Sequence, residues 1–352
     1  MSEISGTLTD QRTRSQNRDR IIHWKKVVEE HEQPHFWRAT WQIVNSLGAY
    51  VAIWIVMYLG LSVSWWMTIP LAILAGGLLV RVFIIFHDCC HGSFFQSARA
   101  NRFWGRLTGL LTFTPFYHWK WQHDVHHGTS GHLDKRGTGD IWTLTVEEYL
   151  AASRWTRFAY RVSRNPVVLF GLAPMLMFLV YNRFPHPAAK GKARRSVWLT
   201  NLALAAMLWG MILAFGWLPW LILQMTVLTV AGAAGVWLFY VQHQFEDAYW
   251  ERDDKWDYTE AALKGSSFYQ LPRVLQWFSG NIGFHHVHHL SHRIPNYNLE
   301  RCHYSNPLFS NVKPLTLIES LRCLHFRLWD EATSKLITFR QLRVKLSDAA
   351  EG

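Results

Sequence analysis

Two long stretches of the chain carry no Asp, Glu, Lys or Arg, and they dominate its hydrophobic pattern. They cover residues 39–80 and 196–245. A helix needs about 20 apolar residues to cross a bilayer, so each stretch is long enough for two crossings. Each also has a break where small residues and tryptophans gather, a composition that suits a short turn at the membrane surface. The pattern predicts four membrane-spanning helices in two hairpins, over residues 41–61, 66–86, 197–216 and 219–242.

Two shorter apolar runs, 107–119 and 165–182, are predicted to lie at the membrane surface. The first is too short to span a bilayer. The second is just long enough, but Pro166 and Pro174 interrupt it, and basic residues flank it on both sides. Such flanks indicate that both ends stay on the cytoplasmic side, so we interpret both runs as interfacial or re-entrant helices. The alternative is a fifth span over 165–182, which would put the polar regions around it on opposite faces of the membrane.

The charged residues agree with this topology. The proposed outer turns carry no charge, and every Lys- and Arg-rich segment falls on one side, as the positive-inside rule requires of the cytoplasmic face. The predicted fold class is an all-α integral membrane protein, with four transmembrane helices as two hairpins, interfacial helices and a cytoplasmic helical cap. The cap comprises residues 1–38, 87–195 and 246–352. We expect one domain over 39–345, after a polar N-terminal segment and before a short tail, 346–352.

Composition narrows the class of protein further. Of the 352 residues, 49% are hydrophobic and 17% are charged, whereas a typical soluble domain has about 25% charged residues. These values describe a membrane protein with a large polar portion and exclude a disordered chain. The net charge of +11 is explained by cytoplasmic basic loops, so no nucleic-acid partner is expected. The four cysteines form no C-x-x-C pair, which indicates free thiols in a reducing compartment.

The chain has 19 histidines, and three clusters of them fall at the predicted cytoplasmic face. Residues 87–91 read H-D-C-C-H, residues 123–127 read H-D-V-H-H, and residues 285–289 read H-H-V-H-H. On a helix, spacings of i, i+3 and i+4 place side chains on one face, which leaves out His286. One such cluster is as well explained by a solvated surface patch, but three on one face predict a metal site. The histidines with this spacing are His87, His91, His123, His126, His127, His285, His288 and His289.

Eight imidazoles exceed the needs of one tetrahedral ion and imply at least two ions, although imidazole suits zinc, copper, iron and nickel alike. His243, at the cytoplasmic end of the last predicted span, is a ninth candidate, because an ionisable side chain at that depth is by default functional. The competing interpretation is an interfacial histidine that faces lipid headgroups. Asp88 and Asp124 adjoin candidate ligands. Each is expected either to accept the remaining N–H of a histidine or to be a surface charge.

The three boxes, H-D-x-x-H, H-x-x-H-H and H-x-x-H-H, resemble those of the membrane fatty acid desaturases. Residues 242–247, 281–284 and 291–299 are similar to the bacterial acyl-lipid branch of that family. The resemblance covers about residues 35–335. It implies a di-iron centre ligated by the eight box histidines, with His243 as an additional ligand at a helix end. It also implies that Asn281 orders a water or a ligand near the metals.

The resemblance further implies an O₂-dependent enzyme that inserts a cis double bond into an acyl chain of a membrane glycerolipid. Its place would be a bacterial inner membrane, with the active site and both termini cytoplasmic. Each turnover would consume two external electrons. The chain has no G-x-G-x-x-G fingerprint and no cysteine cluster, so it carries no recognisable flavin, nicotinamide or iron–sulfur site. We therefore expect a separate carrier, ferredoxin or a similar small protein with its reductase, to dock on the basic cap.

Two other functions stay open from the sequence. A fatty acyl hydroxylase or another di-iron oxygenase could use the same scaffold, because the boxes do not separate these reactions; the acyl-lipid-like C-terminal stretch favours desaturation. A non-catalytic membrane metal carrier would need polar or ionisable ligands within its spans, near the bilayer midplane. The two uncharged stretches offer no such ligands.

Overall fold

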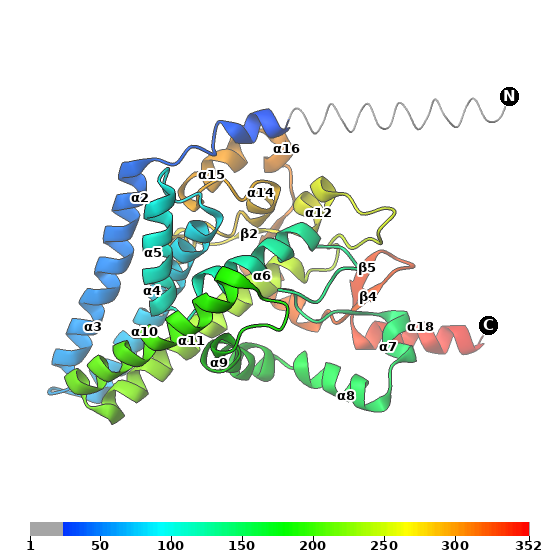
Figure 1. Cartoon of the computed structure of the whole chain (residues 1–352). Coiled ribbons are helices and arrows are strands. Elements are labelled where there is room, and N and C mark those ends of the chain that lie inside the picture. The colour runs from blue at the N-terminus through cyan, green and yellow to red at the C-terminus, as the bar shows by residue number, and fades with distance from the viewer. Residues whose placement is uncertain (1–23, 352) are drawn as a thin grey trace.

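The structure is a computed structural model that describes residues 24–351 and is built mainly from helices (Figure 1). The predicted polar segment 1–38 and the tail 346–352 therefore lie partly outside the described residues. Among the described residues, four helices are long and apolar enough to cross a membrane, and each overlaps one predicted span. They are Phe36–Gly60, α4 (Trp65–His91), α10 (Gly191–Phe215) and α11 (Trp217–His243). The first comprises α2 (Phe36–Ile43), the π-helical turn η1 (Val44–Gly48) and α3 (Ala49–Gly60).

The turns within the two hairpins fall at the breaks expected from the sequence. A turn at residues 61–64 joins α3 to α4, and the Ser64 side chain caps α4 by accepting the backbone N–H of Trp66. Gly216 alone separates α10 from α11, with a φ of +77° that side-chain-bearing residues rarely adopt. In each hairpin the two helices joined by this short connection pack against each other.

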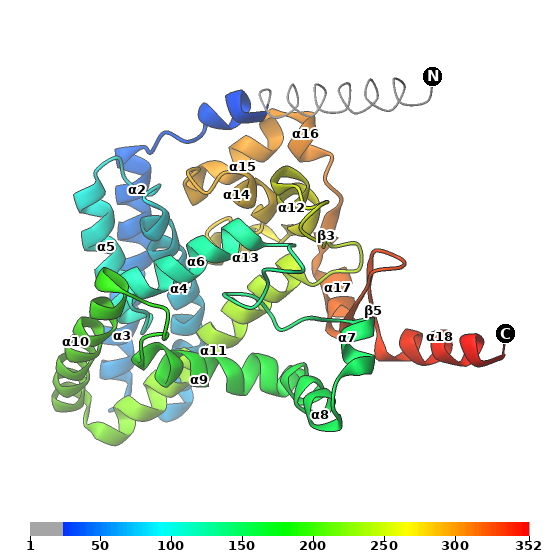
Figure 2. The same ribbon diagram turned by 45° about the vertical axis from the view of Figure 1, so that its right-hand side comes forward.

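Helix α4 is the central element of the membrane part, because it packs against both α3 and α11. Most of its residues from Leu78 to Cys90 are buried. Figures 1 and 2 show α3, α4, α10 and α11 gathered in one part of the molecule, with the shorter elements beyond them. Helices α4 and α11 both end in a histidine where they meet these shorter elements, His91 and His243.

The run 107–119, predicted to be an interfacial or re-entrant helix, is not one continuous helix in the structure. Helix α5 (Ala98–Leu111) ends inside this run, and α6 (Phe116–Thr129) begins inside it. The break has a local cause, since Pro115 restricts the residue before it to extended conformations and Phe113 has a φ of +56°. Residues 112–116 are buried within the protein. Their apolar character therefore reflects an internal turn of the fold.

The second apolar run, 165–182, is helical: it contains η2 (Val168–Leu172), α9 (Ala173–Leu179) and the start of η3 (Tyr181–Arg183). It follows α8 (Arg154–Ser163) at a bend of 65°, and the two would count as a fifth span only if taken together. Helix α8 carries Arg154, Arg157 and Arg161, whose charges are costly in the bilayer core, and its Trp155 and Phe158 side chains are exposed. A surface position for α8, which projects from the molecule in Figure 2, is therefore favoured over a fifth span.

The remaining elements form the cap. A helix over residues 24–29 precedes α2, and the other cap helices are α7 (Val146–Ala151), α12 (Tyr258–Gly265), α13 (Arg273–Phe278), α14 (His285–Leu290), α15 (Asn296–Ser305), α16 (Pro307–Ser310), α17 (Leu317–Ser320), η4 (Leu321–His325) and α18 (Phe339–Glu351). Five short strands add to the predicted all-helical architecture. They are β1 (Leu144–Thr145), β2 (Phe268–Gln270), β3 (Pro314–Thr316), β4 (Leu328–Asp330) and β5 (Lys335–Ile337), ordered β1-β4-β5 and β2-β3.

In the cap, the strands connect segments that are far apart in sequence. β1 pairs in parallel with β4, with Leu144 opposite Leu328, and β4 pairs antiparallel with β5. β2 pairs in parallel with β3. These pairings tie the segment that follows the second histidine box and the segment that precedes the third to the C-terminal part of the chain.

Replacing Gly76 by valine is expected to destabilise the membrane part. A Cβ atom at Gly76 would lie 2.6 Å from the Cβ of Val230 on α11 and 3.1 Å from the Val227 carbonyl oxygen, so the two helices would have to separate. Overpacking of this kind costs about 1–3 kcal/mol, which should appear as a lower melting temperature of the detergent-solubilised protein. Gly235→Val on α11 is the matched control, because a Cβ there meets nothing within 4 Å. Equal shifts in both variants would contradict the close helix packing.

Candidate metal centre

The first histidine box lies in the last turns of α4. His87 and His91 share one face of the helix, with ring centroids 4.7 Å apart, and the helix ends at Gly92, whose φ of +76° is the usual left-handed cap. We expected the box to follow the end of the span. The structure instead continues the same helix through it, so the candidate transmembrane helix itself positions both imidazoles.

In the second and third boxes, some histidines face one cluster of imidazoles and the others face a second cluster. On α6, the Nε2 atoms of His123 and His127 lie 3.1 Å apart, and the ring of His126 lies beside His243. On α14, the His288 Nε2 approaches the His127 Nε2 at 3.0 Å. The His285 Nε2 instead approaches the His243 Nε2 at 2.9 Å. Neighbours in sequence therefore serve two separate clusters.

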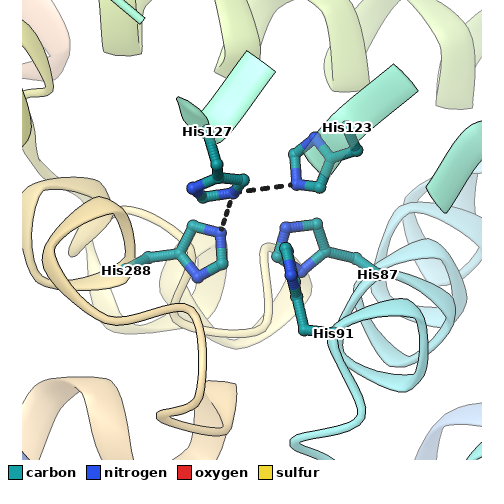
Figure 3. A group of neighbouring side chains, drawn as sticks. All are labelled: His87, His91, His123, His127 and His288. Atoms are coloured by element: carbon teal, nitrogen blue, oxygen red, sulfur yellow. Dashed lines mark hydrogen bonds between the residues drawn. The ribbon is translucent and has the colours of Figure 1, made fainter. Parts of the chain in front are cut away.

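All nine histidines selected from the sequence come together in these two clusters. The five-histidine group comprises His87, His91, His123, His127 and His288, and the four-histidine group comprises His126, His243, His285 and His289. Within each group, one nitrogen of every ring lies within 4.8 Å of those of the others. Figure 3 shows the rings of the five-histidine group facing one another from three separate helices, α4, α6 and α14.

The spacing of the nitrogens fits metal ligation. Two imidazole nitrogens bound at right angles to one ion, each about 2.1 Å from it, are separated by about 3 Å, and the Nε2 pairs above lie 2.9–3.1 Å apart. Several other ring nitrogens are buried without any partner, among them both nitrogens of His91 and the Nε2 atoms of His126 and His289. Buried polar atoms without partners are costly, and ions within the two groups would engage those that face inward.

Burial also sets the protonation state of these rings. Removal from water, with repulsion between the neighbouring imidazoles, lowers the pKa of His123, His127, His285, His288 and His289 well below the usual 6.5. These five rings are thus neutral at neutral pH. Neutral imidazole is the form that donates a lone pair to a metal.

One histidine of the five-histidine group is held by a carboxylate. The Asp88 side chain is buried, its Oδ1 lies 2.9 Å from the Nδ1 of His87, and its Oδ2 accepts the backbone and side-chain N–H groups of Asn296 at 2.6 and 2.8 Å. The Asn296 side-chain oxygen in turn accepts from Gln42 on α2. This network fixes the His87 ring and leaves its Nε2 for a metal, as expected of carboxylate–histidine pairs.

Comparison with known proteins identifies the family. The family model described as "Fatty acid desaturase" matches residues 64–310. The chain is 49% identical over 318 residues, or 90% of both chains, to the "Fatty acid desaturase" of Bacillus subtilis (strain 168). The chain belongs to the fatty acid desaturase family. It is also 28% identical over 261 residues to the "sn-1 oleoyl-lipid 12-desaturase" of Synechocystis sp., covering 70% of this desaturase and 71% of the relative.

The name of a further relative includes ferredoxin. The "sn-1 acyl-lipid omega-3 desaturase (ferredoxin)" of Synechocystis sp. is 26% identical over 249 residues, covering 68% of this desaturase and 67% of the relative. Both cyanobacterial relatives act on acyl lipids according to their names. The family match agrees with the resemblance noted in the sequence. The two histidine groups of this chain, which can hold metal ions, agree with it as well.

The carboxylate beside the four-histidine group is one that the sequence did not suggest. Asp124, expected either to accept from a histidine or to be a surface charge, is half-exposed and pairs with Lys120 one turn earlier on α6, at 3.0 Å. Asp140 instead approaches the four-histidine group, with its Oδ1 2.7 Å from the Nδ1 of His126. Asp140 lies on the loop after α6, 14 residues from its partner, and no periodic spacing in the sequence connects the two.

Asn281 has a structural partner. Its φ is +62°, a conformation that asparagine tolerates better than most residues, and its side-chain N–H donates to the Asn296 backbone oxygen at 3.2 Å. The side chain thus supports the residue that holds Asp88. The expected role in ordering a water or a ligand is not tested by this contact and stays a prediction.

The other buried histidines have different partners. His286, which breaks the spacing of its box, points away from both groups, and its Nε2 lies 3.0 Å from the Nδ1 of His303. His118 accepts the backbone N–H of His186. The partly buried His292 lies beside His91, with tilted rings whose centroids are 4.8 Å apart. The structure therefore separates His286 from the three other histidines of the same box, as the spacing argument predicted.

A third cluster of metal-ligating residue types, His132, Asp134 and Asp253, is an ion-pair network. Asp253 pairs with His132 at 2.9 Å and with Lys135 at 3.0 Å, and Asp134 pairs with Arg252 at 2.5 Å. Both carboxylates are exposed to solvent. Their charges are already matched by cations, and the cluster does not resemble the two buried histidine groups.

Proposed function

We propose that this desaturase is an O₂-dependent acyl-lipid desaturase that inserts a cis double bond into an acyl chain of a membrane glycerolipid, using two iron ions held by its nine clustered histidines. The observation that carries the proposal is the division of these histidines into a group of five and a group of four. Two adjoining all-nitrogen groups offer one ion position each. Zinc has no redox chemistry, whereas iron accepts imidazole ligands and exchanges electrons with O₂.

The overall reaction removes one hydrogen from each of two neighbouring methylene carbons and reduces O₂ to two waters. Two electrons come from the C–H bonds, two come from an external donor, and two protons complete the waters. Iron bound in the two groups would supply the O₂ activation that side chains cannot provide. The protein's part is to hold the ligands, exclude water and position the acyl chain.

Aromatic side chains beside both histidine groups favour an apolar substrate. Trp119 stacks on His123, with ring centroids 4.2 Å apart, and packs against Phe83 and Phe86 of α4. In the four-histidine group, Phe239, one turn before His243 on α11, lies 5.2 Å from that ring. Trp119 and Phe239 are both only partly buried. An acyl chain lying along these aromatic side chains would bring its methylene groups beside the histidines in surroundings with few polar groups.

The setting of the enzyme follows from its charge and its relatives. We infer a bacterial inner membrane, with the histidine groups and both termini on the cytoplasmic side, because the Lys- and Arg-rich segments lie with the cap. We also infer a ferredoxin or a similar small carrier, with its reductase, as the electron donor. The name of the Synechocystis omega-3 relative supports this choice, and a basic cap is complementary to an acidic carrier.

The proposal is tested by the fatty acids of cells that express the chain. Membrane lipids of a bacterial host with a compatible ferredoxin system are transmethylated and analysed by gas chromatography and mass spectrometry, with the host alone as control. We expect a new cis-unsaturated species, whose fragments also give the position of the double bond. Hydroxylated chains in place of unsaturated ones would show that the enzyme is a hydroxylase and not a desaturase. A purified, folded protein without iron would contradict the proposed metal chemistry.

A further inference from the structure

The loop between α6 and β1 folds back over the four-histidine group. Its residue Asp140 places Oδ1 2.7 Å from the Nδ1 of His126, and both side chains are buried, with 8% of the Asp140 side chain and 2% of the His126 side chain exposed. No cation pairs with this carboxylate among the described residues. A buried carboxylate whose close partner is an imidazole has a specific use at a metal centre, namely to hold that ring.

The loop conformation is suited to this contact. Gly137 and Gly139 have φ values of +116° and +77°, which residues with side chains rarely adopt. The Asp140 Oδ2 accepts the backbone N–H of Gly137 at 3.3 Å, which orients the carboxylate. A Cβ atom at Gly139 would lie 3.1 Å from the His126 Cβ and 3.3 Å from the Gln122 carbonyl oxygen. The loop can therefore approach α6 closely only because glycine occupies this position.

The contact also determines which nitrogen of His126 carries the proton. A carboxylate acceptor keeps the proton on Nδ1 and leaves the lone pair on Nε2. The His126 Nε2 is buried without a partner and belongs to the four-histidine group. Asp88 makes the equivalent contact with His87 in the five-histidine group. Each group thus has one histidine oriented by a carboxylate, although the two carboxylates come from a helix and from a loop.

We propose that Asp140 is a positioning residue of the four-histidine group, which holds His126 in the tautomer and orientation needed to bind the second metal ion. This inference rests on the proposed function, because it requires that the group binds iron. It assigns a role to a loop residue outside all three histidine boxes. The effect of removing such a partner is typically a loss of 10–100-fold in metal affinity or activity.

The test measures iron, not only activity. Asp140→Ala and Asp140→Asn are purified in detergent, and iron per chain and the rate of iron removal by a chelator are compared with the unaltered protein. We expect Asp140→Ala to retain about one of two irons, or to lose one of them 10–100-fold faster. Asp140→Asn should be milder, because its side-chain oxygen still accepts the His126 N–H. Asp124→Asn is the matched control, since that carboxylate pairs with Lys120, and it should behave as the unaltered protein.

Two further measurements separate positioning from general damage. Size-exclusion profiles and retention of the other iron report whether the fold survives. In the double variant His126→Ala/Asp140→Ala, iron loss should equal that of His126→Ala alone, because Asp140 acts through this ring. Additive losses, or an Asp140→Ala protein with two irons and unaltered chelator resistance, would overturn the inference. An unaltered protein that binds no iron would instead overturn the proposed function.

Discussion

Replacing His288 by alanine is expected to abolish formation of the double bond and to remove iron from the five-histidine group. His288 is fully buried, and its Nε2 lies 3.0 Å from the Nε2 of His127. Its ring also lies 4.5 Å from that of His87, so it links the α4 and α6 ligands. Loss of one ligand from a group that supplies all protein donors leaves an open position and weakens binding of that ion. The measurement is the fatty-acid profile of expressing cells, together with iron per chain in the purified protein.

The matched control for this variant lies two residues away. His286 belongs to the same box and is equally buried, but its ring faces His303 and not the two groups. His286→Gln can retain a hydrogen bond to His303, and it should keep its full iron content even if its melting temperature falls. If His286→Gln lost iron as His288→Ala does, or if His288→Ala still made the unsaturated product, the assignment of ligands within this box would be wrong.

Removal of the metal should abolish activity completely, and ferrous iron should restore it where zinc does not. Both ions would occupy groups that offer only imidazole nitrogens, which bind iron and zinc alike. Only iron can pass electrons to O₂, because zinc has no redox chemistry. The enzyme is treated with a chelator in detergent under anaerobic conditions, reloaded with either metal, and assayed with reduced ferredoxin and O₂.

The two reloaded samples control for each other. Both should regain the melting temperature of the untreated protein, because either ion fills the histidine groups and stabilises the folded state. Activity should return in the iron sample alone. Activity in the zinc sample, or in the metal-free sample, would exclude redox metal chemistry as the basis of the reaction.

The sequence was sufficient for the four candidate spans and for the membership of the histidine set. Long uncharged stretches predicted the four candidate spans, and helical spacing selected His285, His288 and His289 while leaving out His286. These features depend on local periodicity, which a single sequence displays. The fatty acid desaturase resemblance rested on the same residues, and the family model confirms it.

What the sequence missed depends on contacts between distant segments. Spacing placed His123, His126 and His127 on one face of a helix, but it did not show that they divide between two groups, because this depends on where α11 and α14 pack. The role of Asp140 depends on how a loop folds back over α6. The break inside residues 107–119 was hidden because a buried turn and an interfacial helix are both apolar.

Because the nine histidines lie on four different helices, bound metal should affect how much of this protein accumulates in a cell. They come from α4, α6, α11 and α14, so bound ions would cross-link two membrane helices to two cap helices. A chain made without metal would have to keep these helices together around buried, unsatisfied nitrogens, at a cost in free energy. Proteases remove chains that open readily. Iron starvation should therefore lower the abundance of the desaturase itself, and with it the unsaturation of the membrane, without any change in transcription.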